Sequence, residues 1–178
     1  MIVYAYHIDR SCSNHFQDGD ILTISPTFTD YNTNKLLEST YNNKLTRHGQ
    51  QYLVNPINPT NPWNTLYETI FEYERRINFP QLPSRFQSFF ATQTLEDVDH
   101  WIGKLNLNEY IPVWKVYVDP NKVFKADASW FNLDNFDKST LRISYNALQY
   151  WYGKFKPDFE KEPELLIKES MKLIERIN

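Results

Sequence analysis

The sequence predicts a single α+β domain spanning residues 1–178, and three observations support this prediction. Hydrophobic residues make up 41% of the 178 residues, which is enough to bury one core. Segments with the two-residue period of strands and segments with the 3.6-residue period of helices are interspersed along the chain. Their spacing lacks the regular strand–helix–strand rhythm of parallel sheets, so the α+β class is favoured.

The N-terminal part is expected to contain two strands and one short helix. Residues 2–8 are rich in β-forming side chains and predict a buried strand. An Asp-Gly-Asp turn signal at residues 18–20 precedes a second short strand at residues 21–24. Residues 35–43 fit a short helix, and the glycine within residues 46–49 predicts a break after it.

The middle of the chain predicts a long connection followed by the clearest helix. Three prolines within residues 55–63 exclude a regular hydrogen-bond ladder and predict a surface connection. Thr65 and Glu68 have the spacing of a capping box, and apolar side chains then repeat at helical spacing as far as Ile77. Pro80 is expected to end this helix.

Strands and helices then alternate. Residues 85–91 and residues 112–118 are each expected to form a strand. Between them, Thr94 and Asp97 have the spacing of a second capping box at the start of a helix. Residues 139–152 carry one apolar stripe at helical spacing and predict a further helix.

The C-terminal part is partly ambiguous. Gly153 is expected to stop the preceding helix, and residues 154–163 are charged and expected to be exposed. Residues 165–167 are apolar and predict a strand, whereas residues 171–177 fit a strand or a helix equally well.

Charge and composition disfavour several classes of protein. The formal net charge is −3, which argues against a domain that holds nucleic acid through a basic patch, although one or two arginines suffice for a pyrophosphate. No run of about 18 apolar residues and no signal-peptide pattern exists, so we expect no membrane partner. The single cysteine, Cys12, cannot form an intramolecular disulfide, which favours the cytoplasm.

Several familiar site signatures are missing from the sequence. There is no Walker loop and no glycine-rich dinucleotide turn, and the chain has only 4 glycines. No pair of cysteines could hold zinc, and the four histidines are scattered along the chain, so no metal site is expected.

The first candidate segment is the end of the first predicted strand. His7 lies there on the opposite face from its neighbours, just before the polar pair Asp9 and Arg10. This position suits a side chain that lines a functional site. A structural histidine at the edge of a sheet is the other interpretation.

The second candidate segment places polar side chains among phenylalanines. Ser84 and Arg85 enter a predicted strand in which Ser88 precedes Phe89 and Phe90. Polar groups in such an apolar setting need partners. Arg85 is therefore a candidate site residue, with an ordinary surface cation as the alternative.

The third candidate segment is the acidic run before the strand at residues 165–167. Glu162 and Glu164 are two residues apart, and Glu164 opens a buried strand, so its carboxylate could project into a cleft. A solvated acidic loop is the alternative.

In this order, the three segments resemble the ADP-ribosyltransferase superfamily, on its diphtheria-toxin-like side. The resemblance rests on residues 6–10, residues 88–92 followed at once by a helix, and the Glu-Pro-Glu of residues 162–164. The chain is also similar to uncharacterised bacterial and phage proteins with a Pro-Ser-Arg stretch. The resemblance implies a mixed, split β-sheet around a cleft that binds NAD, with flanking helices.

The resemblance also implies catalytic roles. His7 would hydrogen-bond the ribose on the nicotinamide side. Glu164 would accept from the ribose 2′-hydroxyl and stabilise the positive charge that develops as the glycosidic bond breaks. The proline between Glu162 and Glu164 leaves open which of the two carboxylates has this role.

The resemblance further implies a set of NAD-binding side chains. A guanidinium would pair with the pyrophosphate and an aromatic ring would stack on nicotinamide. The implied residues are His7, Arg10, Ser84, Arg85, Ser88, Phe89 and Phe90.

The expected function is that of an NAD-dependent ADP-ribosyltransferase or NAD-glycohydrolase, with NAD as substrate. ADP-ribose would pass to a macromolecular acceptor, either protein or nucleic acid, or to water. One alternative is a non-catalytic domain of bacterial or phage origin that binds or inhibits a protein partner. Another is a hydrolase that uses His7 together with a carboxylate.

Overall fold

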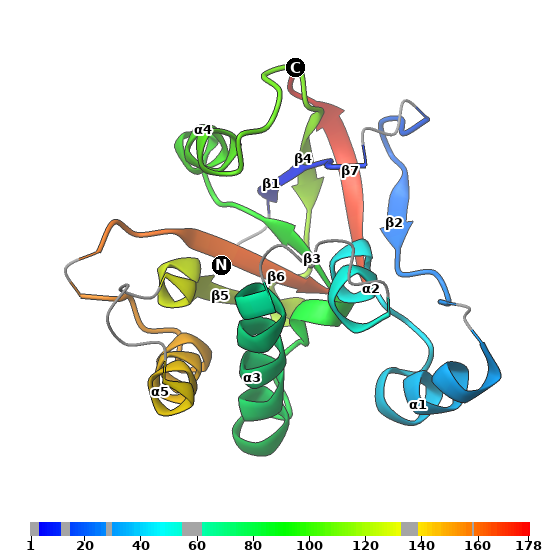
Figure 1. Cartoon of the computed structure of the whole chain (residues 1–178). Helices are drawn as coiled ribbons and strands as arrows, with labels where there is room; N and C mark the ends of the chain where they lie inside the picture. Colours follow the sequence, from blue (N-terminus) through cyan, green and yellow to red (C-terminus); the bar gives the residue numbers. More distant parts are fainter. Residues whose placement is uncertain (1–3, 12–14, 28–29, 55–61, 133–138, 158) are drawn as a thin grey trace.

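Two antiparallel sheets form the centre of the structure, a computed structural model that describes residues 4–11, 15–27, 30–54, 62–132, 139–157 and 159–178 (Figure 1). The larger sheet contains, in spatial order, β1 (Tyr4–Ile8), β4 (Val113–Tyr117), β7 (Ser170–Arg176) and β2 (Ile21–Thr23). The smaller sheet contains, in spatial order, β3 (Ser88–Ala91), β6 (Pro163–Lys168) and β5 (Val123–Asp127).

Two features hold the sheets directly against each other. Tyr6 of β1 and Thr92, which follows β3, exchange two backbone hydrogen bonds of 2.8 Å. The chain also passes from β6 into β7 through the single residue Glu169, whose φ of 73° turns the backbone sharply. Figure 1 shows the resulting corner, at which β6 of the smaller sheet is followed by β7 of the larger one.

Helices lie around these sheets. The described residues form five α-helices: α1 (Tyr31–Tyr41), α2 (Arg47–Leu53), α3 (Pro62–Asn78), α4 (Leu95–Lys104) and α5 (Thr140–Trp151). They also form three short 3₁₀ helices: η1 (Arg85–Gln87), η2 (Pro120–Lys122) and η3 (Ala128–Phe131). α3 and α5 pack side by side against the smaller sheet, while α4 lies near β1 (Figure 1). None of these helices is long and apolar enough to cross a membrane.

Aromatic residues make up 16% of the chain, a content that predicts an aromatic core, and aromatic side chains do build the core between α3, α5 and the smaller sheet. Phe71 of α3 and Tyr150 and Trp151 of α5 are each at most 1% exposed. The strand β6 separates this core from the one beneath the larger sheet. Leu166 faces the first core and its neighbours Leu165 and Ile167 face the second, as the alternation of a strand requires.

Much of the predicted secondary structure is confirmed, including the expectation of one small α+β domain. The capping box of Thr94 and Asp97 opens α4, with both of its hydrogen bonds present. Gly153 has a φ of 68° just after α5, as expected for a helix stop. Residues 171–177, which the sequence left ambiguous between strand and helix, form a strand, because β4 and β2 pair with this segment on either side. Cys12 and residues 55–61 of the predicted surface connection lie outside the described residues.

Two local predictions are wrong. Arg85 begins a 3₁₀ turn rather than a strand, because the Ser84 carbonyl and hydroxyl accept hydrogen bonds from the backbone N–H groups of Gln87 and Phe86. The expected break at residues 46–49 is instead the start of α2, where the Thr46 side chain caps the helix.

The predicted capping box and the predicted mixed sheet are wrong as well. α3 begins at Pro62, upstream of Thr65, and the Glu68 carboxylate binds other side chains in the interior. Every ladder between the described strands is antiparallel. Parallel neighbours need a crossover that returns the chain to the same end of the sheet. The connections here bring each strand to the opposite end of its neighbour.

We predict that Gly49→Ala destabilises the protein. A Cβ atom at Gly49 would lie 2.4 Å from the Phe86 carbonyl oxygen, so α2 and η1 would have to separate. Such overpacking costs about 1–3 kcal/mol of unfolding free energy. Gly103→Ala is the matched control, because a Cβ atom there meets nothing within 4 Å. Urea denaturation should therefore show Gly49→Ala to be weaker than wild type, and Gly103→Ala to be unchanged or more stable.

Candidate functional site

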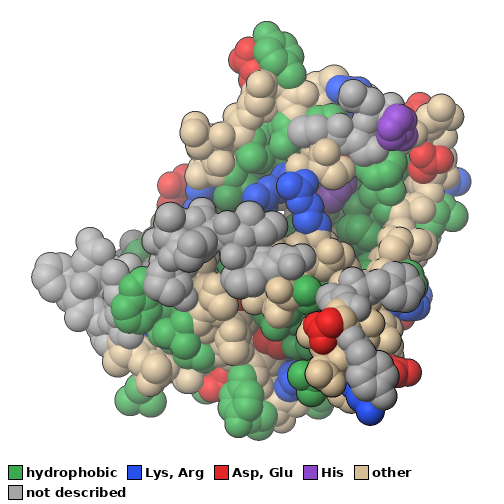
Figure 2. Space-filling model, turned by 45° about the vertical axis from the view of Figure 1, so that its right-hand side comes forward, with side chains coloured by type: hydrophobic (Ala, Val, Ile, Leu, Met, Phe, Trp, Pro, Cys, Tyr) green, Lys and Arg blue, Asp and Glu red, His purple; other side chains and the backbone are tan. Residues whose placement is uncertain are grey.

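A cleft of about 930 Å³ opens where the two sheets meet. Its walls come from β1, β3 and β6, from the helices α2, α3 and α4, and from η3. On the face shown in Figure 2, Lys and Arg side chains gather beside a hollow near the middle of the molecule, with a His side chain next to them. The predicted site residues that line the cleft are His7, Arg10, Arg85, Ser88, Phe89, Phe90 and Glu164.

His7 is held in the cleft wall by β3. Its Nδ1 lies 2.7 Å from the carbonyl oxygen of Phe90, and its ring contacts the Phe89 ring edge-on. Burial lowers the pKa of His7 below its ordinary value of 6.5, although the hydrogen bond to Phe90 opposes this shift. A carbonyl only accepts, so in the neutral ring Nδ1 carries the proton and Nε2 is left as an acceptor.

Arg85 is the centre of a buried ionic cluster under the cleft. Its Nε and Nη2 donate to the two carboxylate oxygens of Glu68 at 2.9 and 3.0 Å. Its Nη1 donates to the hydroxyl of Tyr150 at 2.7 Å and pairs with the Glu164 carboxylate. Burial alone would lower the pKa of Arg85, but the carboxylates of Glu164 and Glu68 raise it well above its ordinary value.

Glu164 faces the cleft from the start of β6. Its carboxylate oxygen Oε1 accepts from Arg85 and from the Tyr150 hydroxyl, the latter at 2.6 Å. Burial raises the pKa of Tyr150 well above its usual 10, so this hydroxyl stays protonated and can donate. No described residue donates to the second oxygen, Oε2. Glu164 is 5% exposed and lines the cleft. Its Oε1 is anchored by two donors, and its Oε2 is therefore the oxygen that can accept from a ligand.

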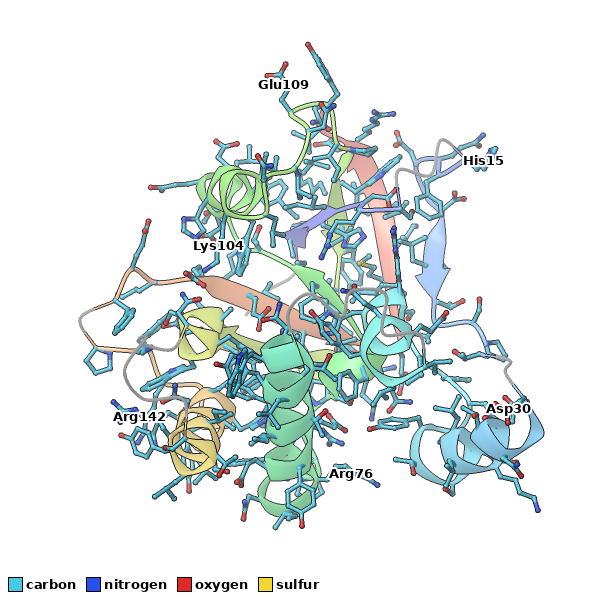
Figure 3. The ribbon with its side chains drawn as sticks, in the orientation of Figure 1. His15, Asp30, Arg76, Lys104, Glu109 and Arg142 are labelled. Atoms are coloured by element: carbon cyan, nitrogen blue, oxygen red, sulfur yellow. The ribbon has the colours of Figure 1, made fainter. Side chains whose placement is uncertain are left out.

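The second carboxylate of the acidic run also lines the cleft. Glu162 Oε1 accepts from Asn132 Nδ2 at 2.7 Å and pairs with Lys104 at the end of α4. Figure 3 shows Lys104 between α4 and β6. Both carboxylates of the Glu-Pro-Glu segment therefore face the cleft, and each has its own cationic partner.

Of the predicted arginines and serines that remain, Arg10 and Ser88 line the cleft and Ser84 does not. Arg10 is exposed at the cleft, and Arg47 Nη1 donates to the Arg10 carbonyl at 2.7 Å, so two guanidinium groups share this rim. Ser84 does not line the cleft, and its hydroxyl donates to Glu72 at 2.9 Å. Ser88 lines it, although its hydroxyl donates to the Ser84 carbonyl. Ser84 therefore supports the η1 turn and contributes no group to the cleft.

Three residues of this site, Glu68, His48 and Tyr150, are not predicted from the sequence. Glu68 looked like a helix cap, His48 lay in a predicted break, and Tyr150 looked like one more core aromatic. The spacing of Glu68 and His48 in the chain carries no signal of their proximity, yet Glu68 Oε1 lies 3.1 Å from His48 Nε2. The one sequence signal for this site is Glu68 itself, because a glutamate on the apolar face of a helix needs a cation as its partner in the interior.

A metal centre is not supported in the part of the chain that the structure describes. No group of three His, Cys, Asp or Glu side chains gathers there in a way that could hold a metal ion.

Comparison with known proteins places the chain in a family but gives no activity. A family model described as "Protein of unknown function (DUF2441)" matches residues 5–178. No curated protein matches the chain significantly. The match includes every residue that lines the cleft.

We predict that Glu68 makes the stability of the protein pH-dependent. Burial alone would raise the pKa of Glu68, but Arg85 and His48 lower it from 4.5 to about 2. Because the folded pKa is depressed, this stabilisation is present above pH 4.5 and is lost as the pH falls towards 2. A shift of this size corresponds to roughly 3 kcal/mol.

Denaturation of Glu68→Gln at several pH values tests this prediction. The variant should be less stable than wild type at pH 7, and the difference should shrink towards pH 2. Glu96→Gln, on the exposed surface of α4, is the control and should track wild type at every pH. A constant difference between Glu68→Gln and wild type would contradict the assignment.

Proposed function

We propose that the chain, which belongs to this family of unknown function, binds NAD in the cleft and transfers its ADP-ribose to an acceptor or to water. The single observation that carries the proposal is the position of Glu164 in the same cleft as His7 and the Phe89–Phe90 pair. These residues come from β6, β1 and β3, and they are the ones that the resemblance to ADP-ribosyltransferases implies. The split arrangement of two sheets around the cleft is consistent with that fold.

The cleft suits a dinucleotide in size and in polarity. Ligand pockets commonly enclose about 300–1,000 Å³, and this cleft lies in the upper part of that range. His7 Nε2 is an acceptor for a ribose hydroxyl, because Nδ1 is committed to the Phe90 carbonyl. The half-buried rings of Phe89 and Phe90 offer apolar surface on which nicotinamide can stack.

The pyrophosphate is assigned to the arginine rim. Arg85 is 6% exposed and is bound to two carboxylates, so it is poorly placed to hold a second anion. Arg10 is exposed at the cleft, and Arg47 lies beside it. A guanidinium binds phosphate oxygens through two parallel N–H groups, so Arg10 is the better of the two arginines that the sequence suggested.

Glu164 is assigned the stabilisation of the reacting ribose. Its Oε2 would accept from the ribose 2′-hydroxyl, and its charge would oppose the positive charge that develops as the bond to nicotinamide breaks. Arg85 and Tyr150 fix the other oxygen, so the carboxylate does not need to reorganise during the reaction. A cytoplasmic location, as the single cysteine suggests, completes the proposal.

One observation favours a second candidate, a non-catalytic domain that binds a protein partner. Glu164 is already neutralised by a buried arginine, which would weaken its effect on a substrate cation. A domain of this type would keep the cleft but would not turn over NAD. The experiment below separates the two functions.

We predict that Glu164→Gln abolishes turnover without unfolding the protein. Glutamine keeps an oxygen for Tyr150 and Arg85, and Arg85 keeps its pair with Glu68. Release of nicotinamide from NAD should fall by roughly 100-fold or more, as for the loss of a group that stabilises transition-state charge. NAD should still raise the melting temperature of the variant. Full activity in Glu164→Gln would refute its role, and a wild type that NAD does not stabilise would favour the second candidate.

We predict that Arg10→Gln weakens NAD binding more than it weakens turnover. A hydrogen bond to a charged group is worth about 1.5–3 kcal/mol, which corresponds to roughly tenfold or more in Kd. Calorimetric titration with NAD measures this change. Arg142→Gln is the control, because Arg142 is an exposed residue of α5 that does not line the cleft (Figure 3). Equal Kd values for the two variants would exclude Arg10 from the site.

A further inference from the structure

We propose that His48 is the general base that activates the acceptor, with Glu68 as the residue that orients it. The inference rests on the proposed function and deepens it, because it assigns the acceptor side of the cleft. The sequence alone gives His48 no role, and His48 has no part in the proposed binding of NAD. Three structural features support the assignment: the position of the ring, the contact of its Nε2, and the charges around it.

The ring of His48 forms part of the cleft wall. It projects from α2, and its side chain is 18% exposed. The rings of Tyr52 and Phe90 each lie 4.8 Å from it, measured between centroids. Phe90 also lies over Arg85, 5.0 Å from ring centroid to guanidinium carbon, so His48 and the Glu164 anchor share one aromatic neighbour. The two ends of the cluster therefore face one cleft.

The two ring nitrogens of His48 have different surroundings. Nε2 is fully buried and lies 3.1 Å from Glu68 Oε1. A carboxylate at this nitrogen favours the tautomer in which Nε2 carries the proton. Among the described residues none hydrogen-bonds Nδ1, so Nδ1 is the nitrogen left for a ligand in the cleft. A carboxylate behind a histidine, with a free nitrogen in front, is the arrangement of a general base.

The charged groups beside His48 leave a negative charge next to its ring. Glu68 faces it from α3, and Arg85 faces Glu68 from η1. Tyr52 lies on the same helix, and burial raises the pKa of its hydroxyl, so it stays neutral. Arg85 neutralises one of its two carboxylate partners, and the other leaves an excess negative charge in the cluster. An imidazolium at His48 would balance that charge.

The proposed step conserves atoms and charge. The acceptor O–H gives its proton to His48 Nδ1 while its oxygen forms a bond to the ribose C1′. The bond between C1′ and the nicotinamide nitrogen breaks, and its electron pair leaves with nicotinamide, which becomes neutral. The imidazolium then returns its proton to solvent through the cleft. Glu68 only orients the ring, so it is a positioning residue.

Release of nicotinamide from NAD with water as the acceptor tests the inference. His48→Gln keeps an amide that can donate to Glu68 but removes the base from the cleft. We expect kcat to fall by roughly 100-fold, within the range for a lost general base, and KM for NAD to change little. The wild-type rate should depend on pH, because only the neutral imidazole can accept the proton, and the rate of the variant should not.

Two further variants guard against a structural explanation. His48→Ala opens a space beside Glu68, and added imidazole should restore part of its activity, which a merely structural role would not allow. His100→Gln is the matched control, because His100 on α4 also faces a carboxylate, at 3.5 Å from Glu160, but does not line the cleft. It should keep the rate and the pH profile of wild type.

The outcomes separate this inference from the proposed function. The role of His48 is overturned if His48→Gln binds NAD in calorimetry and keeps the wild-type kcat. It is also overturned if imidazole does not restore activity to His48→Ala. Both results leave NAD binding in place. A wild type that binds NAD but releases no nicotinamide overturns the role of His48 and the proposed transfer, and leaves only NAD binding in place. A wild type that does not bind NAD overturns both. Loss of kcat in His48→Gln, its pH-independent rate and imidazole rescue of His48→Ala support the inference.

Discussion

The rest of the structure depends on one interaction, the pairing of the buried Arg85 guanidinium with the carboxylates of Glu68 and Glu164. A buried charge is tolerated only when it is paired and hydrogen-bonded, and Arg85 takes its partners from three separate elements. Glu68 comes from α3, Glu164 from β6 and Tyr150 from α5. These elements cannot shift relative to one another without leaving a charge uncompensated, so the cluster fixes the floor of the cleft.

The pairing with Arg85 explains how two carboxylates can be buried among aromatic side chains at the cleft. Glu68 and Glu164 lie on either side of one cation, and each also meets a second group, His48 for Glu68 and Tyr150 for Glu164. Each carboxylate is therefore held in place while it faces the cleft from a different side. In the proposed chemistry, one side acts on the ribose and the other orients the base, and a single arginine positions both.

The junction of the two sheets has the complementary role of placing His7. The Tyr6–Thr92 bridge aligns β1 with the end of β3, which brings His7 Nδ1 to the Phe90 carbonyl. At the other end of the junction, the turn at Glu169 lets one continuous segment belong to both sheets. Lys122 binds the Glu169 carboxylate at 2.6 Å and secures this corner at the surface. The cleft lies where the sheets diverge from this shared backbone.

The sequence singled out only several of the residues that line the cleft. By itself it determined the α+β class, the aromatic character of the core, and the caps at Thr94 and Gly153. These features follow from local periodicity and from backbone preferences, which neighbouring residues are enough to express. Only the tertiary structure decided that residues 171–177 form a strand, that Arg85 begins a turn, and that Glu68 binds Arg85 and His48 rather than capping a helix. A strand needs partners on either side and a buried charge needs its counterion, and both are supplied by residues far away in the chain.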